Sequence, residues 1–536
     1  MPAPASRSSI VRLLSLTANQ GCRGCGRTHS VLDHHAHAHP HAHAHAHAHH
    51  APHAHHLPAQ FGRGAMGVRG MATPVDTPLM GPPPGDGDYA FEMAASNLRF
   101  GAHATREVGQ DFSNMISQLP AAERSGAKIG VFTDPNVAKL PVMEVVEESL
   151  VREGLNWVVW DKCAVEPTDK SWQAAIDFAR SSNITHFLAV GGGSSMDTAK
   201  AANLFTNYPD ADLYEFINAP IGRGRPIERK LSPLIAIPTT AGTGSETTGT
   251  AILDIPSKSF KTGIASRALK PTLGIVDLNN TATCPREVAI AAGLDVLFHS
   301  LESWTAVPFN ERTPRPANPI NRPAYQGSNP ISDIFSKWAL ETTIKYLPRI
   351  SKDAQGDTEA RAQMLLAAST AGIGFGNAGV HIPHAFSYPI SSLNKGRPKE
   401  RQYHHPSYAP DVPLIPHGVA VSLTAPAVFN FTAPSSPQRH REAAAIFMGD
   451  RAGELARVRD EDLGRVLQEE IRRFLDILGV PRGLSEVGYK NEDIATLVEG
   501  CMPQRRVLDL APILAKDDKA QEREQLTHIV EGSMSW

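Results

Sequence analysis

The residues His186-Phe-Leu-Ala-Val190 form a mostly apolar run that leads directly into Gly191-Gly-Gly-Ser-Ser-Met-Asp-Thr-Ala-Lys200. The run predicts a buried strand, and the residues after the glycines predict the start of a helix. Glycines at such a turn let backbone N–H groups approach a pyrophosphate, whose charge the helix N-terminus attracts. The spacing matches neither the GxGxxG fingerprint nor a Walker A loop. A phosphate site of another family is therefore favoured over a plain glycine turn.

The same alternation of short apolar runs and helical patterns extends from about residue 88 to 282. It predicts a mostly parallel, doubly wound α/β sheet, in which ligands bind beyond the carboxyl ends of the strands. The candidate strands are residues 128–133, 156–160, 186–190, 234–237 and 273–276.

Two other predicted strands also end in polar residues. Asp134 follows the first strand, where an acidic side chain can accept hydrogen bonds from a ribose or simply cap a helix. Residues 238–249 follow the fourth strand and contain six hydroxyl side chains and three glycines among twelve positions. This stretch offers many donors to ribose and nicotinamide groups. Lys261 comes next and can reach a ribose or phosphate, although a solvated lysine is the ordinary alternative.

From about residue 283 onward the strand signals fade and long helical patterns dominate. This change predicts an all-α domain packed on the nucleotide domain, with a ligand cleft between the two. The predicted helices are residues 288–304, 331–347, 358–371, 438–448, 461–478 and 490–498.

Asp295 and His299 lie four residues apart in the first long helix, and thus on one face of it. A carboxylate and an imidazole side by side can hold a divalent metal, or can hydrogen-bond as a core pair. His384 and His417 are candidates for further ligands. His381 is a rival to His384, and spacing alone does not separate the two.

The first 82 residues differ from the rest of the chain. Six arginines stand there against two acidic residues, and a Ser-containing apolar run opens the segment. This composition predicts a mitochondrial transit peptide. A His-Ala tract (34–56) reads as low complexity, with loose metal binding as the alternative. Cys22 and Cys25 are a weak zinc or redox signal, and residues 78–87 read as a linker.

Composition narrows the class of protein. The chain has 536 residues, of which 41% are hydrophobic, and carries a net charge of −3. The charge gives no electrostatic case for nucleic acid as a partner. No apolar run is long enough for a transmembrane helix. Five cysteines over this length favour a reducing compartment over a disulfide framework.

Four motifs occur in a fixed order, and together they resemble the iron-containing alcohol dehydrogenase family over residues 90–536. They are Gly-Gly-Gly-Ser-x-x-Asp-x-x-Lys, Pro-Thr-Thr-x-Gly-Thr-Gly-Ser-Glu, Gly-x-Asp-x-x-x-His-x-x-Glu and Pro-His-Gly. The resemblance implies a dinucleotide-binding domain (88–282) followed by an all-helical, metal-binding catalytic domain (283–536). This is the dehydroquinate synthase-like architecture. Dehydroquinate synthase and glycerol dehydrogenase share it, but the acid-and-histidine set fits the iron branch better.

The resemblance also implies the site residues. The metal, usually Fe(II) although Zn is possible, falls to a catalytic set of Asp295, His299, His384 and His417. His384 is preferred over His381 because it keeps the family spacing to Pro389. The implied contacts to a tightly bound NAD are Asp134, Gly192, Gly193, Ser194, Thr239, Thr240, Thr243, Lys261 and Leu278. One departure is Tyr388, which stands where many members have a second histidine. The proton-relay role of that histidine therefore does not carry over to this chain.

The resemblance further implies the activity. Residues 90–94, 322–332, 374–387 and 388–417 resemble a mitochondrial matrix branch that passes hydride between hydroxy and oxo acids. The expected pair is 4-hydroxybutyrate and 2-oxoglutarate, with a homo-oligomer as the expected assembly. Cations must bind the substrate carboxylates, and the candidates are Arg322, Lys395, Arg397, Lys399 and Arg401. For the last four, a solvated surface charge is the alternative. The alternatives are an ordinary NAD-dependent alcohol dehydrogenase and a metal-binding protein built on the His-Ala tract.

Overall fold

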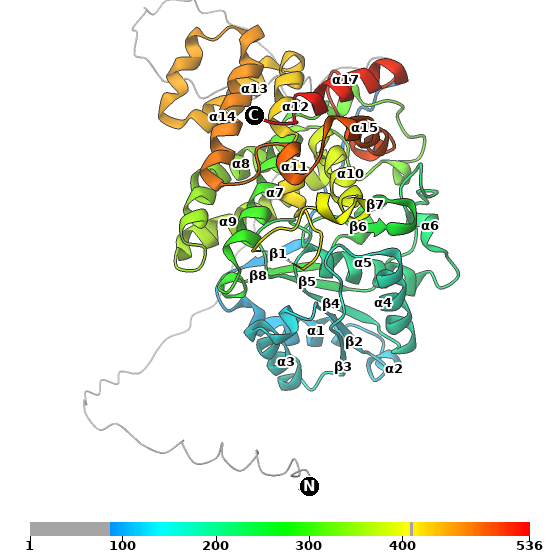
Figure 1. Cartoon of the computed structure of the whole chain (residues 1–536). Helices are drawn as coiled ribbons and strands as arrows, with labels where there is room; N and C mark the ends of the chain where they lie inside the picture. Colours follow the sequence, from blue (N-terminus) through cyan, green and yellow to red (C-terminus); the bar gives the residue numbers. More distant parts are fainter. Residues whose placement is uncertain (1–85, 408–410) are drawn as a thin grey trace, which may run out of the picture. The chain divides into compact units, whose positions relative to one another are not determined.

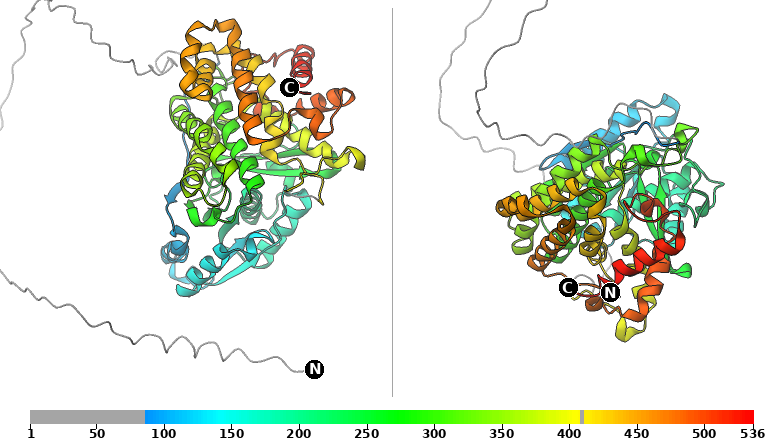
Figure 2. Two further views of the ribbon diagram at one scale, coloured as in Figure 1. Left: turned by 60° about the vertical axis from the view of Figure 1, so that its left-hand side comes forward. Right: turned by 90° about the horizontal axis from the view of Figure 1, so that it is seen from above.

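A computed structural model of the chain describes residues 86–407 and 411–536. The predicted transit peptide, the His-Ala tract, Cys22 and Cys25 lie outside the described residues. Figure 1 shows the parallel sheet with its flanking helices in blue to green, and the later helices in green to red. In Figure 2 these two groups of elements again occupy opposite ends of the described region.

The sheet has six parallel strands in the order β1-β8-β5-β4-β2-β3. All five predicted strands are present, and within this sheet the sequence missed only the edge strand β1. The strands are β1 (Asn97–Phe100), β2 (Ile129–Phe132), β3 (Trp157–Trp160), β4 (His186–Gly191), β5 (Leu234–Pro238) and β8 (Leu273–Val276). Gly191 pairs with Pro238, so the glycine turn and the hydroxyl-rich loop leave the sheet side by side.

Helices cover both faces of the sheet. On one face α1 (Val108–Ser117) and α3 (Pro141–Arg152) pack on alternate residues of β2 and β4. On the other face α4 (Asp169–Ser181) and α5 (Gly193–Asn207) pack on the remaining ones. Every residue of β2, β4, β5 and β8 is buried, which explains why their sequences are continuous apolar runs. The predicted doubly wound sheet is confirmed.

The chain changes direction between β2 and β4. From β2 it moves outward to β3, and from β3 it crosses back to β4 on the other side of β2. Ligands of open α/β sheets bind at such a switch point, beyond the carboxyl ends of the strands. Asp134 follows β2 and the glycine turn follows β4, so both leave the sheet there.

An antiparallel hairpin of β6 (Thr250–Ile255) and β7 (Phe260–Ala265) was not predicted. It follows the hydroxyl-rich loop and has its own small core with Trp172 and Phe205. Lys200 of α5 is fully buried and ties this region together, because its ammonium donates to Ser245 and to the Thr250 carbonyl. The hairpin carries Lys261 to the cleft described below.

The helical half contains the six predicted helices and several more. The predicted ones are α7 (Arg286–Thr305), α8 (Pro330–Lys352), α9 (Thr358–Ala378), α13 (Pro437–Met448), α14 (Asp460–Leu478) and α15 (Ile494–Cys501). The others are α10 (Ile382–Gly396), α11 (His417–Ser422), α12 (Ala425–Thr432), α16 (Arg505–Leu508) and α17 (Lys519–Glu531). The short helices α2 (Ala121–Arg124) and α6 (Leu213–Phe216) belong to the sheet half.

Helix α7 is the centre of this half. From Gly293 to Thr305 every residue is buried, as expected for a helix that is covered on all sides. Helices α8, α9 and α11 pack around it. Gly293 and Gly418 allow the closest approaches, since a Cβ at Gly418 would lie 1.9 Å from the carbonyl oxygen of Ala291. This contact seats the start of α11 directly on α7.

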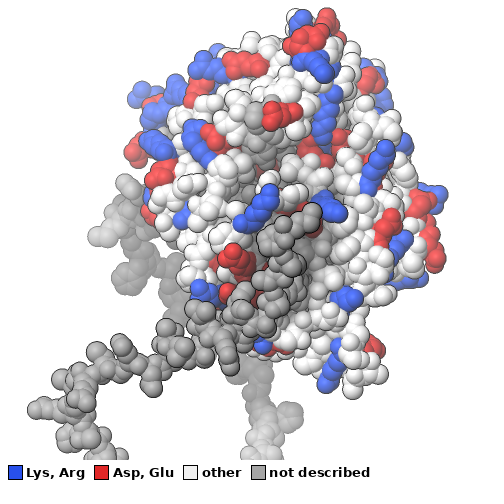
Figure 3. All heavy atoms as spheres, turned by 60° about the horizontal axis from the view of Figure 1, so that its bottom comes forward, with Lys and Arg blue, Asp and Glu red and all other residues white. Residues whose placement is uncertain are grey.

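The described surface carries mixed charge. Figure 3 shows lysine and arginine interspersed with aspartate and glutamate over the visible part of one face. Among the described helices, none combines the length and the apolar character that a membrane crossing requires.

Candidate metal and nucleotide site

Asp295 and His299 face one another on α7, as their spacing predicts. The His299 Nε2 atom lies 3.4 Å from Asp295 Oδ1, and both side chains are almost completely buried. Phe375 of α9 stacks on the His299 ring with centroids 3.6 Å apart. The imidazole therefore has one orientation, held from the side by an apolar ring.

His384 reaches the same carboxylate from α10. Its Nε2 atom lies 3.4 Å from Asp295 Oδ1, and its Nδ1 atom lies 2.6 Å from Oε1 of Glu302. The other oxygen of Glu302 accepts a hydrogen bond from the backbone N–H of His381 at 2.7 Å. Glu302 is fully buried one turn after His299. It fixes the His384 ring and leaves Nε2 directed at Asp295.

His417 approaches from the first residue of α11. Its Nε2 atom lies 3.7 Å from Asp295 Oδ1, and its ring centroid is 5.4 Å from that of His384. The His417 side chain is 31% exposed, so it forms the open side of the cluster. Three imidazoles from three helices thus converge on one carboxylate oxygen.

The spacing suits a metal better than a hydrogen-bond network. At 3.4–3.7 Å the nitrogen–oxygen contacts are too long for good hydrogen bonds. Ligand atoms about 2.1 Å from one ion at tetrahedral angles lie about 3.4 Å apart. Asp295 Oδ1 and His384 Nε2 are both buried without a hydrogen-bond partner. Ligand atoms of Asp295, His299 and His384 all lie within 4.8 Å of one another. The residues fit a divalent ion.

The side chains of the cluster are shifted to different pKa values. Burial lowers the pKa of His299 to about 3 and that of His417 to about 4, although Asp295 opposes both shifts. Burial alone would also lower the pKa of His384, but Glu302 and Asp295 raise it to about 9. Burial opposes ionisation of Asp295, yet the three imidazoles hold its pKa well below the usual range. The cluster therefore offers a carboxylate, two neutral imidazoles and one imidazole whose proton an ion replaces.

His381 faces away from this cluster. Its Nε2 atom lies 3.0 Å from the Thr305 hydroxyl, and its ring packs edge-on against Phe429. The side chain is fully buried among helices of the core. Sequence spacing left His381 and His384 as rivals, and the geometry favours His384.

The cluster opens into a cleft of about 810 Å³ between the sheet half and the helical half. The carboxyl ends of β2, β4 and β5 form one wall of this cleft. Eight of the nine residues assigned to the nucleotide line it, namely Asp134, Gly192, Gly193, Ser194, Thr239, Thr240, Thr243 and Lys261. Leu278 does not line it. It begins the 3-10 turn Leu278–Thr281, of which Asn280 does reach the cleft.

The glycine turn lies against the hydroxyl-rich loop. A Cβ at Gly193 would lie 2.6 Å from the Thr243 methyl group, so only glycine lets the two segments meet. Gly193 also begins α5, whose first residues line the cleft. The Asp134 carboxylate accepts from the backbone N–H groups of Asn136 and Val137. Asp134 therefore caps its own turn while lining the cleft.

Lys261 is nearly buried and pairs with Glu166 at 3.0 Å. Glu166 also pairs with Lys395 at 2.7 Å. Burial opposes ionisation of Glu166, but the two ammonium groups hold its pKa at about 2. Glu166 was not predicted as a site residue, because its partners are 95 or more positions away in the sequence.

The cations suggested for substrate carboxylates are engaged elsewhere. Arg322 pairs with Asp88 and Glu92, and Arg401 pairs with Glu492 and Asp493. Arg397 donates to Asn394 and to the Val487 carbonyl. Lys399 is exposed on the surface. Of these candidates, only Lys395 lines the cleft.

Tyr388, which stands where relatives often have a histidine, also lines the cleft. Its ring lies nearly parallel to that of His417, with centroids 6.3 Å apart. Its hydroxyl accepts a hydrogen bond from Arg506 at 2.6 Å. Arg506 was not singled out from the sequence.

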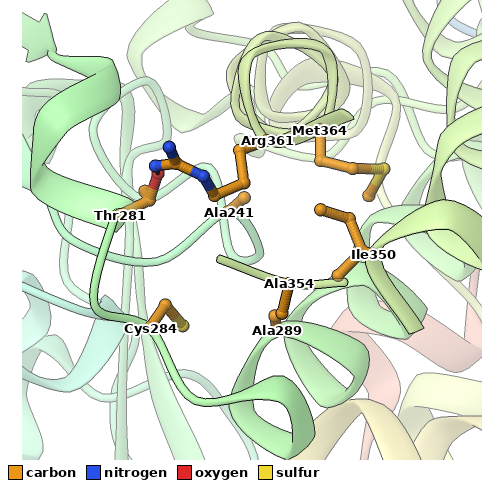
Figure 4. A pocket seen from close by; sticks show the side chains of 8 residues that line it. All are labelled: Ala241, Thr281, Cys284, Ala289, Ile350, Ala354, Arg361 and Met364. Atoms are coloured by element: carbon orange, nitrogen blue, oxygen red, sulfur yellow. Dashed lines mark hydrogen bonds between the residues drawn. The ribbon is translucent and has the colours of Figure 1, made fainter. Parts of the chain in front are cut away.

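A second cavity, of about 20 Å³, lies beside the cleft and has room for about one water molecule. Figure 4 shows its mostly apolar lining, with Arg361 reaching towards Thr281 and Cys284 opposite. The cavity is too small for a substrate.

Comparisons with known proteins agree with this geometry. Residues 95–278 match the model of iron-containing alcohol dehydrogenase, and residues 324–394 and 404–523 match the C-terminal model of the same family. The chain is 49% identical to mouse mitochondrial hydroxyacid-oxoacid transhydrogenase over 455 residues, 85% of this chain and 92% of the relative. It is 49% identical to the human enzyme of that name over 448 residues, 83% and 90% of the two chains.

Solved structures show the same fold at lower identity. The NADH-dependent butanol dehydrogenase A of Thermotoga maritima superposes with a TM-score of 0.64 at 22% identity, covering 84% of this chain and 99% of that one.

Proposed function

The chain belongs to the iron-containing alcohol dehydrogenase family, and from that membership we propose that it is a mitochondrial hydroxyacid-oxoacid transhydrogenase. The 49% identity to enzymes of that name, over most of both chains, carries this conclusion. The family depends on a metal ion and on NAD(H). We propose 4-hydroxybutyrate as the hydride donor and 2-oxoglutarate as the acceptor. The products are succinate semialdehyde and 2-hydroxyglutarate.

We assign the metal, as Fe(II), to Asp295, His299, His384 and His417. Support comes from the convergence of three imidazoles on one buried carboxylate oxygen. A bound ion polarises the carbon–oxygen bond of the substrate that is being oxidised or reduced.

We assign the nucleotide to the wall formed by the ends of β2, β4 and β5. The first N–H groups of α5 attract the pyrophosphate, and the hydroxyl-rich loop supplies donors to the rest of the cofactor. NAD(H) held at this wall would supply the hydride carrier, reduced by the donor and reoxidised by the acceptor without net consumption. Residues 88–282 are proposed as the nucleotide domain and residues 283–536 as the metal domain, with the substrates between them.

The chain's own residues prepare the reacting end of the cleft. Glu302 holds the His384 ring, and Phe375 covers the His299 ring, so both imidazoles are fixed before a substrate arrives. Phe375 and Val380 give this end apolar walls, which limit water around the transferred hydride. His417 is the most exposed of the three and borders the space that a substrate oxygen enters.

The test is turnover of 4-hydroxybutyrate with 2-oxoglutarate by purified protein, without added NAD. We expect sustained formation of 2-hydroxyglutarate, since a retained cofactor is reoxidised in every cycle. If the reaction needs stoichiometric free NAD, the protein is an ordinary NAD-dependent alcohol dehydrogenase of the same family. An assay with NAD and 4-hydroxybutyrate alone serves as the control, because it reports at most one turnover when the cofactor stays bound.

A further inference from the structure

Three lysine or arginine side chains line the cleft, and two of them are already neutralised. Lys261 pairs with Glu166, and Lys395 pairs with Glu166 and with Asp254 at 3.2 Å. Arg506 has no such partner. Among the described residues no carboxylate forms an ion pair with it, and its electrostatic neighbours are two tyrosines. Within the described part of the chain, Arg506 is thus the lysine or arginine of the cleft wall that no carboxylate neutralises.

The Arg506 guanidinium is held in place but incompletely satisfied. Nη2 donates to the Tyr388 hydroxyl at 2.6 Å, and the group lies over the Tyr325 ring, 5.0 Å from its centroid. Nη1 is buried and has no hydrogen-bond partner. An unpaired buried donor on a charged group is costly, so such an arrangement is typical of a site completed by an anion.

Both tyrosines connect Arg506 to the proposed metal ligands. Tyr388 lies parallel to His417. Tyr325 meets Phe375 edge-on, with centroids 6.4 Å apart, and Phe375 stacks on His299. One or two aromatic rings therefore separate the guanidinium from the imidazoles. Arg506 therefore lies close to the cluster in the wall of the same cleft.

The two proposed substrates share one chemical spacing. In 4-hydroxybutyrate two methylene groups separate the carbinol carbon from the carboxylate. In 2-oxoglutarate two methylene groups separate the keto carbon from the distal carboxylate. One cation at a fixed distance from the reacting carbon suits both molecules, although one is an alcohol and the other a ketone.

We propose that Arg506 binds this shared distal carboxylate and so selects both the hydride donor and the hydride acceptor. The inference rests on the proposed transhydrogenase function. A guanidinium pairs with a carboxylate through two parallel N–H donors, which fixes orientation as well as position. The Tyr388 hydroxyl accepts from Arg506, so its own proton is free to donate to the same carboxylate. The selected class is acids with two methylenes between the reacting carbon and the carboxylate.

The experiment compares each substrate with an analogue that has a methyl group in place of the distal carboxylate. These pairs are 4-hydroxybutyrate with 1-butanol, and 2-oxoglutarate with 2-oxopentanoate. In Arg506→Met we expect kcat/KM for both acids to fall by about 100-fold or more, because the buried charge pair is lost. The values for the two analogues should change by only a few-fold. The preference for each acid over its methyl analogue is then lost for the donor and for the acceptor alike.

Matched variants separate this role from a structural one. Lys395→Met removes a paired cation from the same cleft and should leave the acid-to-analogue ratios unchanged. Tyr388→Phe removes the hydrogen bond to Arg506 and should lower the ratios much less than Arg506→Met. Arg506→Lys keeps a positive charge but lacks the two parallel N–H donors of the guanidinium, and we expect an intermediate acid-to-analogue ratio. Metal content and melting temperature show whether each variant is folded.

A binding readout complements the kinetics. Succinate carries the distal carboxylate but no reducible ketone, so it should raise the melting temperature of the wild-type protein and not that of Arg506→Met. The inference is overturned if Arg506→Met keeps the wild-type ratios, or if Tyr388→Phe alone reproduces the whole loss. In both cases the wild-type protein still turns over the substrate pair. If the wild-type protein does not oxidise 4-hydroxybutyrate, the proposed function and this inference fail together.

Discussion

His381 and His384 stand three residues apart at the start of α10, and their side chains face different surroundings. His384 contacts Asp295 and Glu302, whereas His381 contacts Thr305 and Phe429. Sequence spacing did not separate the two, because the backbone conformation at the helix start decides which ring faces Asp295. The motif around Asp295 did contain the missing partner, since Glu302 occupies its last position.

Replacing each histidine tests this assignment. We expect His384→Ala to lose the metal and the transhydrogenase activity together. His381→Ala should retain the metal and lose stability, by about 1–3 kcal/mol, because it leaves a cavity and removes the hydrogen bond between His381 and Thr305. Metal analysis and thermal unfolding of the two purified variants distinguish the cases. Loss of metal from His381→Ala with full occupancy in His384→Ala would reverse the assignment.

Glu166 predicts a pH dependence of stability. Its pKa is about 2 in the folded protein and near 4.5 when unfolded, so the folded state binds its proton more weakly. The resulting stabilisation, about 3 kcal/mol, is fully present above pH 4.5 and is lost as the pH falls towards 2.

Denaturant unfolding at pH 7 and pH 4 measures this contribution. Glu166→Gln should be less stable than the wild-type protein at pH 7, and the difference should shrink at pH 4. A difference that is the same at both pH values would show that Glu166 acts through packing rather than charge. Asp169→Asn, at an acidic residue with no ion pair in the described structure, is a suitable control.

At the scale of elements, the contact between α11 and α7 positions His417. The Pro-His-Gly motif places Gly418 directly over the carbonyl oxygen of Ala291. Gly418→Ala puts a methyl group 1.9 Å from that oxygen, so α11 must move away from α7. We expect a loss of about 1–3 kcal/mol in stability and a weaker metal site. Melting temperature and metal content measure both effects.

Gly453→Ala is the matched control, because no atom lies within 4 Å of its added Cβ. It should change neither quantity appreciably. If Gly418→Ala behaves like Gly453→Ala, the close approach of α11 does not position His417.

The sequence predicted those elements whose burial shows directly as a pattern of apolar residues. The buried strands read as continuous apolar runs because helices cover both faces of the sheet. The hairpin β6–β7 escaped prediction because Asp254, Lys261 and Gly263 interrupt its apolar residues. Helix α10 escaped as well, since it contains Pro383 and Pro389 and buries polar residues such as Ser387 and Asn394 along with apolar ones. Tertiary packing, rather than local pattern, specifies these two elements.

At the scale of the whole molecule, the site depends on contacts between distant segments. The pair Asp295 and His299 was visible from helix spacing, and the glycine turn from its place after a strand. Arg506 was not, because its partner Tyr388 is 118 positions away and Arg506 belongs to none of the recognised motifs. Functional residues that share one helix or one turn could be predicted from the sequence. The pair of Tyr388 on α10 and Arg506 on α16 could be recognised only in the folded structure.

All four proposed metal ligands lie between residues 295 and 417. If the protein is a transhydrogenase, the first 82 residues are therefore dispensable for catalysis. A chain that begins at residue 83 should keep one metal per protomer and full kcat/KM for 4-hydroxybutyrate. The rival reading, a metal-binding protein built on the His-Ala tract, predicts that this truncation removes most of the bound metal. Metal analysis after dialysis decides between them. The full chain with Asp295→Ala is the reciprocal experiment, since it should lose activity while any loosely held metal on the tract remains.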